Sequence, residues 1–459
     1  MKRLLIANRG EIACRIMRSA RELGIHTIAV FSEADRNARH VSEADEAHCI
    51  GPAPAAKSYL VKEHLLEAAR VSRADAIHPG YGFLSENADF AQNVLDAGLI
   101  WVGPSPDLIR MMGDKQNARV TAKQAGVPIV PGSTCFAVDH IEGVAEAADT
   151  VGFPLLVKAT AGGGGIGMRE VDRPEKLEEA VRGVQRAALS AFGEGAIYLE
   201  RFIPRARHVE IQVFGFGDDN PLHFFERDCS LQRRFQKVLE ESPSPRLPDS
   251  VRNHMCEAAL ALCRQTRYSG AGTVEFIVDA DTFEFFFLEM NTRIQVEHPV
   301  TEMLTGVDLV RLQLLLSSGK LTDQDRVAPS RKGAAIEARL YAENPNKSFF
   351  PSPGTLQRFA LPAASQTVRI DSGYREKDAI TPFYDPMVAK IIVWGETREQ
   401  AIETAQSALA QTHVEGLMTN RDFLIACLDH PAFRAGDVHT GFIQEHRDVL
   451  IPQTPRTPR

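Results

Sequence analysis

The stretch from residue 287 to residue 298 carries the side chains best suited to chemistry. It reads Phe-Leu-Glu-Met-Asn-Thr-Arg-Ile-Gln-Val-Glu-His. In an extended strand successive side chains point to opposite faces, so Glu289, Asn291 and Arg293 would share one face. Two oxygen-bearing side chains two residues apart suit Mg²⁺, which takes one or two carboxylates and completes its shell with phosphate and water. The arginine can hold an anion beside them, although a half-exposed strand with a solvated polar face shows the same alternation.

A second apolar run upstream predicts a hairpin. Residues 271–278 and 283–288 are both strand-like, and Asp279-Ala280-Asp281 lies between them. Such a hairpin can place Glu275 across from Glu289 and supply a second carboxylate to a metal ion. The sequence does not fix the register.

A glycine-rich loop follows another strand pattern. Residues 153–158 form an apolar run that ends in Lys158, and residues 162–167 read Gly-Gly-Gly-Gly-Ile-Gly. Consecutive glycines expose backbone N–H groups and let the chain pass close to a ligand. Met168 stands where a Walker loop needs lysine, which excludes that motif. A flexible linker has the same composition, but because the strand-like run 168–171 follows, we favour a mobile phosphate lid joining two strands.

The N-terminal third predicts a parallel sheet. Residues 4–7 and 26–31 are apolar runs, and a helical pattern lies between them at 11–23, which is a βαβ arrangement. The turn after the first run holds one glycine, so the Gly-x-Gly-x-x-Gly fingerprint of nicotinamide cofactors is absent. The Pro- and Gly-rich loop 78–87 would lie at the carboxyl edge of this sheet, where ligands bind in open α/β folds, although a plain structural turn has the same composition.

Composition indicates a large cytoplasmic protein of about three domains. The chain has 459 residues, 44% hydrophobic and 24% charged, with a formal net charge of -8, so neither nucleic acid nor another polyanion is an expected partner. Seven cysteines are scattered without a Cys-x-x-Cys pair, a pattern that suits a reducing compartment. No apolar run is long enough for a signal peptide or a membrane span.

Two further segments have ambiguous chemistry. Residues 226–241 mix basic and acidic side chains, and we expect them to form a surface charge network. In the strand-like run 196–203, Glu200 and Ile203 can flank a purine, but ordinary sheet residues would look the same. Residues 114–126 predict an amphipathic helix, and the polar segment 321–331 predicts a domain boundary.

Taken together, these motifs resemble those of the biotin carboxylase family of ATP-grasp enzymes. The match covers residues 6–13, 78–87, 112–115, 162–168, 207–212, 226–237, 289–302 and 384–387, and agreement of many motifs in order makes it specific. The resemblance implies an α/β chain with a Rossmann-like (pre-ATP-grasp) domain at 1–112 and an ATP-grasp region at 113–330 that includes a mobile lid at about 131–203. It further implies a C-terminal α+β domain at 331–450 and a disordered tail at 451–459.

The resemblance also implies a reaction. ATP activates bicarbonate to carboxyphosphate, which breaks down so that CO₂ reaches N1 of a biotin borne by a separate carrier protein. Lys237, Arg293 and the N–H of Val296 would hold bicarbonate, Glu297 would deprotonate it, and Arg339 would stabilise the enolate of biotin. Mg²⁺ or Mn²⁺ would bind Glu275, Glu289 and Asn291. The cofactor-binding residues would be Lys115, Lys158, Gly164, Gly165, Met168, Glu200, Arg201, Phe202, Ile203, His208, Gln232, Glu275, Glu289 and Val296.

Some positions depart from the common family pattern. Ile166 and Phe235 stand where an arginine and a histidine are frequent, which changes lid and ribose contacts. The loop 162–167 and the run 384–393 are more similar to the biotin carboxylase portion of urea carboxylases. No Ala-Met-Lys-Met-like biotinylation segment occurs, so we expect a free-standing subunit whose partners are a biotin carboxyl carrier protein and a carboxyltransferase, with the final carboxyl acceptor chosen elsewhere.

The family also implies a homodimer. Arg18, Glu22 and Arg369 match positions at its interface, while an aromatic partner is replaced near Gln366.

Two other classes of function remain open at this stage. Another ATP-grasp ligase, joining a carboxylate to an amine, explains the metal ligands and lysines but not Arg293, Glu297 and Arg339 together. A non-catalytic nucleotide-binding regulator would be favoured by loss of a metal ligand or a lid glycine, and both sets are present. We therefore expect an enzyme.

Overall fold

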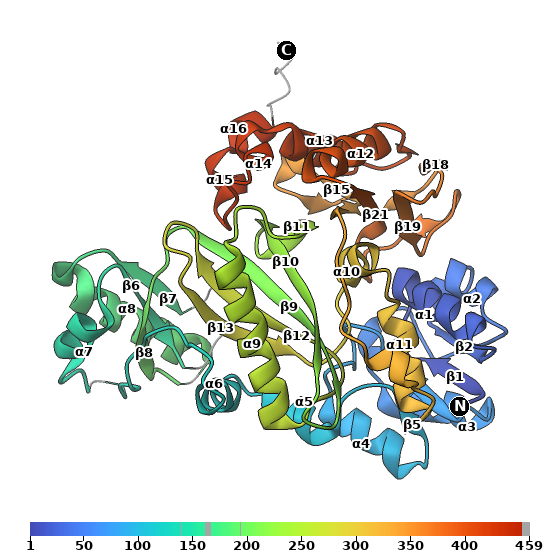
Figure 1. The fold of residues 1–459 in the computed structure, drawn as a ribbon, viewed down its shortest axis with the longest axis horizontal. Coiled ribbons are helices and arrows are strands. Elements are labelled where there is room, and N and C mark those ends of the chain that lie inside the picture. The colour runs from blue at the N-terminus through green and yellow to red at the C-terminus, as the bar shows by residue number, and fades with distance from the viewer. Residues whose placement is uncertain (139, 161–166, 193, 452–459) are drawn as a thin grey trace.

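The computed structural model describes residues 1–138, 140–160, 167–192 and 194–451. Gly164, Gly165 and Ile166 of the glycine loop, and the tail after residue 451, lie outside the described residues. Figure 1 shows a lobe that protrudes at the left, a central sheet, and helices that cover the C-terminal strands at the top.

A five-stranded parallel sheet begins the chain, as the βαβ pattern predicts. Its order is β3-β2-β1-β4-β5, and its inner strands are mostly apolar because helices cover them. The strands are β1 (Arg3–Ile6), β2 (His26–Phe31), β3 (Glu46–Cys49), β4 (Ala76–His78) and β5 (Ile100–Trp101). The helices are α1 (Gly10–Glu22), α2 (Arg39–Glu43), α3 (Lys62–Val71), α4 (Ala88–Asp96), α5 (Pro106–Gly113) and α6 (Lys115–Gln124).

The protruding lobe is a three-stranded antiparallel sheet with its own core. The strands β6 (Leu155–Ala159), β7 (Met168–Val171) and β8 (Ile197–Arg201) lie in the order β7-β6-β8. Helices α7 (Val144–Val151) and α8 (Leu177–Phe192) pack on them around apolar residues such as Val157, Val181 and Leu199. The glycine loop therefore joins two neighbouring strands, β6 and β7, as expected.

An eight-stranded sheet forms the centre of the molecule, in the order β13-β12-β9-β10-β11-β14-β21-β19. The strands are β9 (Ala206–Phe216), β10 (Leu222–Arg233), β11 (Gln236–Ser242), β12 (Ser269–Asp279), β13 (Phe285–Asn291), β14 (Ala334–Tyr341), β19 (Val368–Ser372) and β21 (Met387–Gly395). Along the chain, helix α9 (Asp249–Thr266) lies between β11 and β12, and helices α10 (His298–Thr305) and α11 (Leu309–Ser317) lie between β13 and β14. Because β11 pairs with β14, the sheet continues across the boundary expected at 321–331.

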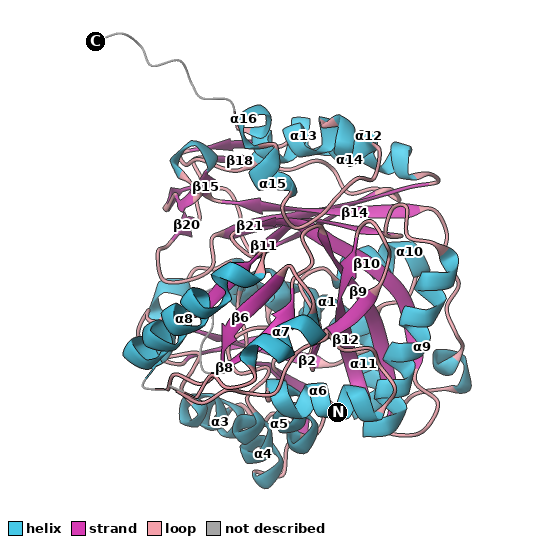
Figure 2. Ribbon diagram, turned by 90° about the vertical axis from the view of Figure 1, so that its left-hand side faces the viewer, coloured by secondary structure: helices cyan, strands magenta, loops and turns pink. Residues whose placement is uncertain are grey.

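The C-terminal part adds short strands and a helical layer. The helices are α12 (Arg398–Ala410), α13 (Arg421–Asp429), α14 (Pro431–Arg434), α15 (Phe442–Glu445) and α16 (Arg447–Leu450). The short strands are β15 (Glu343–Asn344), β16 (Phe350–Pro351), β17 (Gly354–Thr355), β18 (Arg358–Ala360), β20 (Ala379–Ile380) and β22 (His413–Glu415). Figure 2 shows the helical layer above β14 and β21. No helix in the described part of the chain is long and apolar enough to cross a membrane.

The alternation along β14 gives the C-terminal strands two different faces. Ala334, Ile336 and Ala338 join the core under α12 and α13, whereas Glu337 and Arg339 point to the other side, where α10 packs. All eight residues of β14 are buried. A charged layer is therefore enclosed between the sheet and α10.

The expectation of a surface charge network at 226–241 is wrong. This segment forms β10 and β11, and Glu226, Arg227, Asp228, Glu240 and Glu241 are all buried. These strands occupy the middle of the sheet, where each charge meets an opposite charge from a distant segment.

Candidate active site

The predicted hairpin is confirmed, and its register brings polar groups together. Glu275 of β12 lies opposite Glu289 of β13, and a bulge follows. The Asn291 amide donates to Glu275 at 2.8 Å, and Arg293 donates to the Asn291 oxygen at 2.9 Å. Because β13 ends at Asn291, Arg293 reaches this group from the bend after the strand. Arg293 also donates to Glu86 of the loop 78–87 at 2.9 Å, so that loop reaches the site.

Lys237 of β11 is the cation at the centre of the site. Its Nζ lies 2.7 Å from Glu210, 3.2 Å from Glu275 and 2.6 Å from Glu297. Its side chain is 13% exposed, and an ammonium offers three N–H donors to such partners. The arrangement therefore holds Glu297 beside the acidic pair of the hairpin.

Glu297 is a buried carboxylate held from two sides. Arg339 Nη2 lies 2.9 Å from its Oε2, opposite Lys237, and the residue is 2% exposed. Burial alone would raise the pKa of Glu297, but Lys237 and then Arg339 outweigh burial and hold it well below its ordinary value. Glu297 is consequently ionised at neutral pH and is able to accept a proton.

The acidic pair of the hairpin fits a divalent cation. Burial and the neighbouring Glu275 raise the pKa of Glu289, because both disfavour its ionised form. A bound metal ion would stabilise that ionised form. Carboxylate and amide oxygens from Glu275, Glu289 and Asn291 are a hard donor set that suits Mg²⁺ or Mn²⁺. His208 lies 2.8 Å from Glu275, so a metal ion at Glu275 would share that carboxylate with an imidazole.

His208 connects the acidic pair to another expected nucleotide residue. Gln232 lies 2.9 Å from its Nδ1. Burial opposes the charged form of His208, but Glu275 outweighs burial and raises its pKa. Both ring nitrogens of His208 are thus engaged, Nε2 with Glu275 and Nδ1 with the Gln232 amide nitrogen.

The remaining expected nucleotide residues form a second group along β6, β8 and α6. Lys158 and Arg119 hold the buried Glu200 at 2.5 Å and 2.7 Å. Ile203 is buried, while Lys115 is exposed at the first turn of α6. Arg201 and Phe202 are half-buried, Met168 is exposed, and Val296 is half-buried in the turn before α10. Among the described residues, neither Lys115 nor Lys158 contacts Lys237 directly, because Lys158 pairs with Glu200 and Lys237 pairs with Glu210, Glu275 and Glu297.

Several residues of the site were not predicted from the sequence. Arg227 is fully buried and donates to Glu210, Gln212 and Gln295 at 2.6–2.8 Å. Glu210 and Gln212 share a face of β9 with His208, so strand alternation could have identified them. Arg227 carries no such local signal, because its partners come from other strands and from the turn before α10.

Three protein-family models match successive parts of the chain. "Biotin carboxylase, N-terminal domain" matches residues 1–109, "Carbamoyl-phosphate synthase L chain, ATP binding domain" matches 114–324, and "Biotin carboxylase C-terminal domain" matches 337–445.

Curated relatives match over almost the whole chain. Biotin carboxylase 1 of Bacillus subtilis is 48% identical over 450 residues, which are 98% of this chain and 99% of that protein. The alpha subunit of mitochondrial methylcrotonoyl-CoA carboxylase from Dictyostelium discoideum is 48% identical over 455 residues. The match covers 99% of this chain and 65% of that subunit, so the chain spans about two thirds of the longer relative.

Solved structures share the fold. The biotin carboxylase domain dimer of Hydrogenobacter thermophilus 2-oxoglutarate carboxylase, in complex with MgADP, ADP and bicarbonate, has a TM-score of 0.87 at 41% identity, with 98% of both chains covered. The urea carboxylase of Kluyveromyces lactis has a TM-score of 0.78 at 38% identity, with 96% of this chain and 32% of that chain covered.

Proposed function

The chain belongs to the biotin carboxylase family of ATP-grasp enzymes, and from that membership we propose that it uses ATP and bicarbonate to carboxylate biotin presented by a carrier domain. The observation that carries the proposal is the position of Glu297. Its carboxylate lies between Lys237 at 2.6 Å and Arg339 at 2.9 Å. Lys237 in turn contacts Glu275, a candidate metal ligand. A base, an anion-holding cation and an arginine for biotin are thus adjacent.

The proposed roles follow from charge and geometry. Lys237, Arg293 and the Val296 N–H hold bicarbonate, and Glu297 accepts its proton, because a carboxylate that is ionised at neutral pH needs no prior deprotonation. Glu275, Glu289 and Asn291 would hold Mg²⁺ or Mn²⁺, which neutralises phosphate charge during phosphoryl transfer when bound. Arg339 stabilises negative charge on the ureido oxygen of biotin, as an oxyanion-hole donor does.

The nucleotide roles are proposed for the second group of residues. Lys115, Lys158 and His208 would contact phosphates and ribose, while Glu200 to Ile203 would line the adenine site. The glycine loop 162–167 would close over the phosphates. Family matches that change near residues 110 and 330 support the division into the domains 1–112, 113–330 and 331–450.

The partners are proposed from the relatives. A carrier and a carboxyltransferase would complete the reaction, and the acceptor of the carboxyl group would be set by the carboxyltransferase rather than by this site. Cytoplasmic location is also a proposal, supported by cysteines that are all unpaired.

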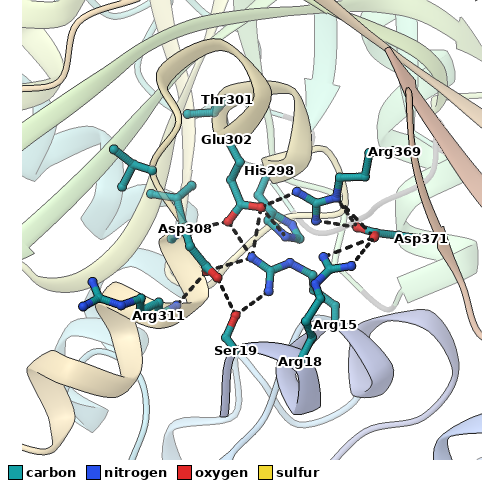
Figure 3. Close-up of polar contacts among 12 residues, drawn as sticks. Arg15, Arg18, Ser19, His298, Thr301, Glu302, Asp308, Arg311, Arg369 and Asp371 are labelled. Carbon is teal, nitrogen blue, oxygen red and sulfur yellow. Dashed lines mark hydrogen bonds and ion pairs between the residues drawn. The ribbon is translucent and has the colours of Figure 1, made fainter. Parts of the chain in front are cut away.

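A homodimer through α1 and β19 is part of the same proposal. Figure 3 shows Arg18 and Arg369 converging on Asp371, while Arg15 and Arg369 converge on Glu302. The Arg18 side chain is 45% exposed, so it remains available to a second copy. Light scattering at micromolar concentration would return the dimer mass, and a monomer mass would contradict the dimer.

The test of function is ATP hydrolysis with and without bicarbonate and free biotin. We expect hydrolysis to require bicarbonate and to rise with biotin. Arg339→Met should lower carboxybiotin formation by about a hundredfold or more, as loss of an oxyanion donor does, while the KM for ATP stays unchanged. Hydrolysis that ignores both bicarbonate and biotin would overturn the proposal. Arg182→Met, at an exposed ion pair with Glu178, is the control.

A further inference from the structure

Lys390 is a buried cation to which the roles above give no task. It lies on β21 opposite Arg339 of β14, on the charged face of the sheet. Its side chain is 0% exposed, and its Nζ lies 2.8 Å from the Val296 carbonyl oxygen and 3.0 Å from Glu11. Burying an ammonium is costly unless strong acceptors meet it. A carbonyl in the turn before α10 is one of its acceptors.

The geometry of that turn makes the carbonyl contact important. In a trans peptide the C=O and the N–H are coplanar and point in opposite directions. The Gln295 carbonyl accepts from His298 Nδ1 at 2.7 Å, so the Val296 N–H of the same peptide points away from His298. Lys390 holds the next carbonyl, that of Val296. Two successive peptides are therefore each held at the carbonyl, which constrains the direction of the Val296 N–H and the position of the Glu297 backbone.

The donors behind the turn are themselves held in place. A carbonyl can only accept, so His298 carries its proton on Nδ1. Burial, and then the charge of Lys390, keeps the pKa of His298 well below its ordinary value. Tyr81 donates to Glu11, the ionic partner of Lys390. The N-terminal helix α1 and the loop 78–87 thus support Lys390 through Glu11.

We propose that Lys390 is a positioning residue of the bicarbonate site, which holds the Val296 carbonyl so that the Val296 N–H and the Glu297 carboxylate face the anion. Nothing in the described chain accepts a hydrogen bond from the Val296 N–H, which leaves it for the anion. The inference rests on the proposed function and adds to it a lysine from the C-terminal strands, with Glu11 of α1 as its anchor.

The competing explanation is that Lys390 only neutralises Glu11 between two parts of the fold. The two explanations differ in what happens when both charges are removed together. Lys390→Met alone would leave Glu11 buried without its cation and would impair folding, because an uncompensated buried charge is strongly destabilising. The double variant Lys390→Met with Glu11→Gln removes both charges and keeps the side-chain sizes similar. It loses the bond to the turn without leaving Glu11 as a buried charge that has lost its cation.

The experiment measures ATP hydrolysis as a function of bicarbonate and of ATP for the wild type and the double variant. Loss of a charged hydrogen bond that orients the anion site should raise the KM for bicarbonate by about tenfold or more, with the KM for ATP within about twofold. Amide hydrogen exchange across residues 292–297 should become faster in the double variant. Arg398→Met is the control, because it breaks a half-buried pair with Glu241 on the other face of the sheet and should lower stability without changing the KM for bicarbonate.

The outcomes separate this inference from the proposed function. If the wild type shows bicarbonate-dependent hydrolysis and the double variant keeps its KM for bicarbonate, the positioning role is overturned and the proposed function stands. Equal changes in both KM values with unaltered exchange at 292–297 would likewise overturn it. A wild type that ignores bicarbonate would overturn the proposed function, and this inference with it.

Discussion

Arg339 is held by more negative charge than its proposed role requires. Glu240 lies 2.6 Å from Arg339 Nε and is 1% exposed. Glu337 of β14 pairs with Glu240 across the sheet and is fully buried. Burial raises the pKa of Glu240 to about 7, with Arg339 opposing the rise and Glu297 adding to it. Burial also raises the pKa of Glu337 well above its ordinary value.

Glu240→Gln should therefore change how stability depends on pH. The folded pKa of Glu240 is raised from 4.5 to about 7, so its contribution is full below pH 4.5 and is lost as pH rises through 7. The slope for one such group reaches about 1.4 kcal/mol per pH unit. Urea unfolding of both proteins from about pH 5 to about pH 8 should show the variant gaining on the wild type as pH rises. Parallel profiles would contradict the assignment, and Glu178→Gln on the exposed face of α8 is the control.

At the scale of elements, the strands β10 and β11 show why a local sequence pattern does not distinguish a buried charge from an exposed one. Arg227 meets Glu210 of β9 and Gln295 of the turn before α10, while Arg233 meets Glu343 of β15. None of these partners is a sequence neighbour. A mixed run of charges is usually solvated, and only the position of these strands in the middle of the sheet reverses that expectation.

Arg227→Met tests the structural weight of this buried charge. The side chain is 0% exposed, and it lies 2.6 Å from Glu210. Breaking a buried pair leaves an uncompensated charge, which typically costs about 3–5 kcal/mol. Arg182→Met, which breaks the exposed pair with Glu178, should cost less than about 1 kcal/mol. Denaturant unfolding measures the free energy of unfolding of both variants. Equal losses would show that the buried pair of Arg227 stabilises the fold no more than an exposed pair does.

The hairpin shows that the local sequence pattern predicts which side chains share a face but does not predict the strand register. Alternation placed Glu289 and Asn291 on one face, and β13 has them beside Glu275. The register stayed open in the sequence because a bulge at Leu288, which is 45% exposed, depends on contacts made outside the hairpin. The pairing of β14 with β11 was not predicted either, because pairing between distant strands leaves no periodic signal.

At the scale of the whole molecule, the C-terminal strands and the protruding lobe differ in how far each depends on the central sheet for its core. The C-terminal strands continue the sheet, and their core includes Val238 and Leu239 of β11. The protruding lobe of β6–β8 has a core of its own. Its entry and exit lie together, because Gly132 and Glu200 pair as an isolated bridge. Figure 1 shows the lobe apart from the C-terminal helices.

Two deletions should therefore behave in opposite ways. A chain that joins Gly132 to Glu200 through a short Gly-Ser linker should keep one cooperative unfolding transition, since the core at Val130, Ile203 and Phe286 remains. A chain shortened after Arg331 should aggregate, because β11 becomes a long unpaired edge with exposed apolar side chains. Soluble yield and denaturant unfolding measure the contrast. A soluble, cooperatively folding fragment 1–331 would show that the central sheet closes without β14, and that the boundary in the sequence is also a boundary in stability.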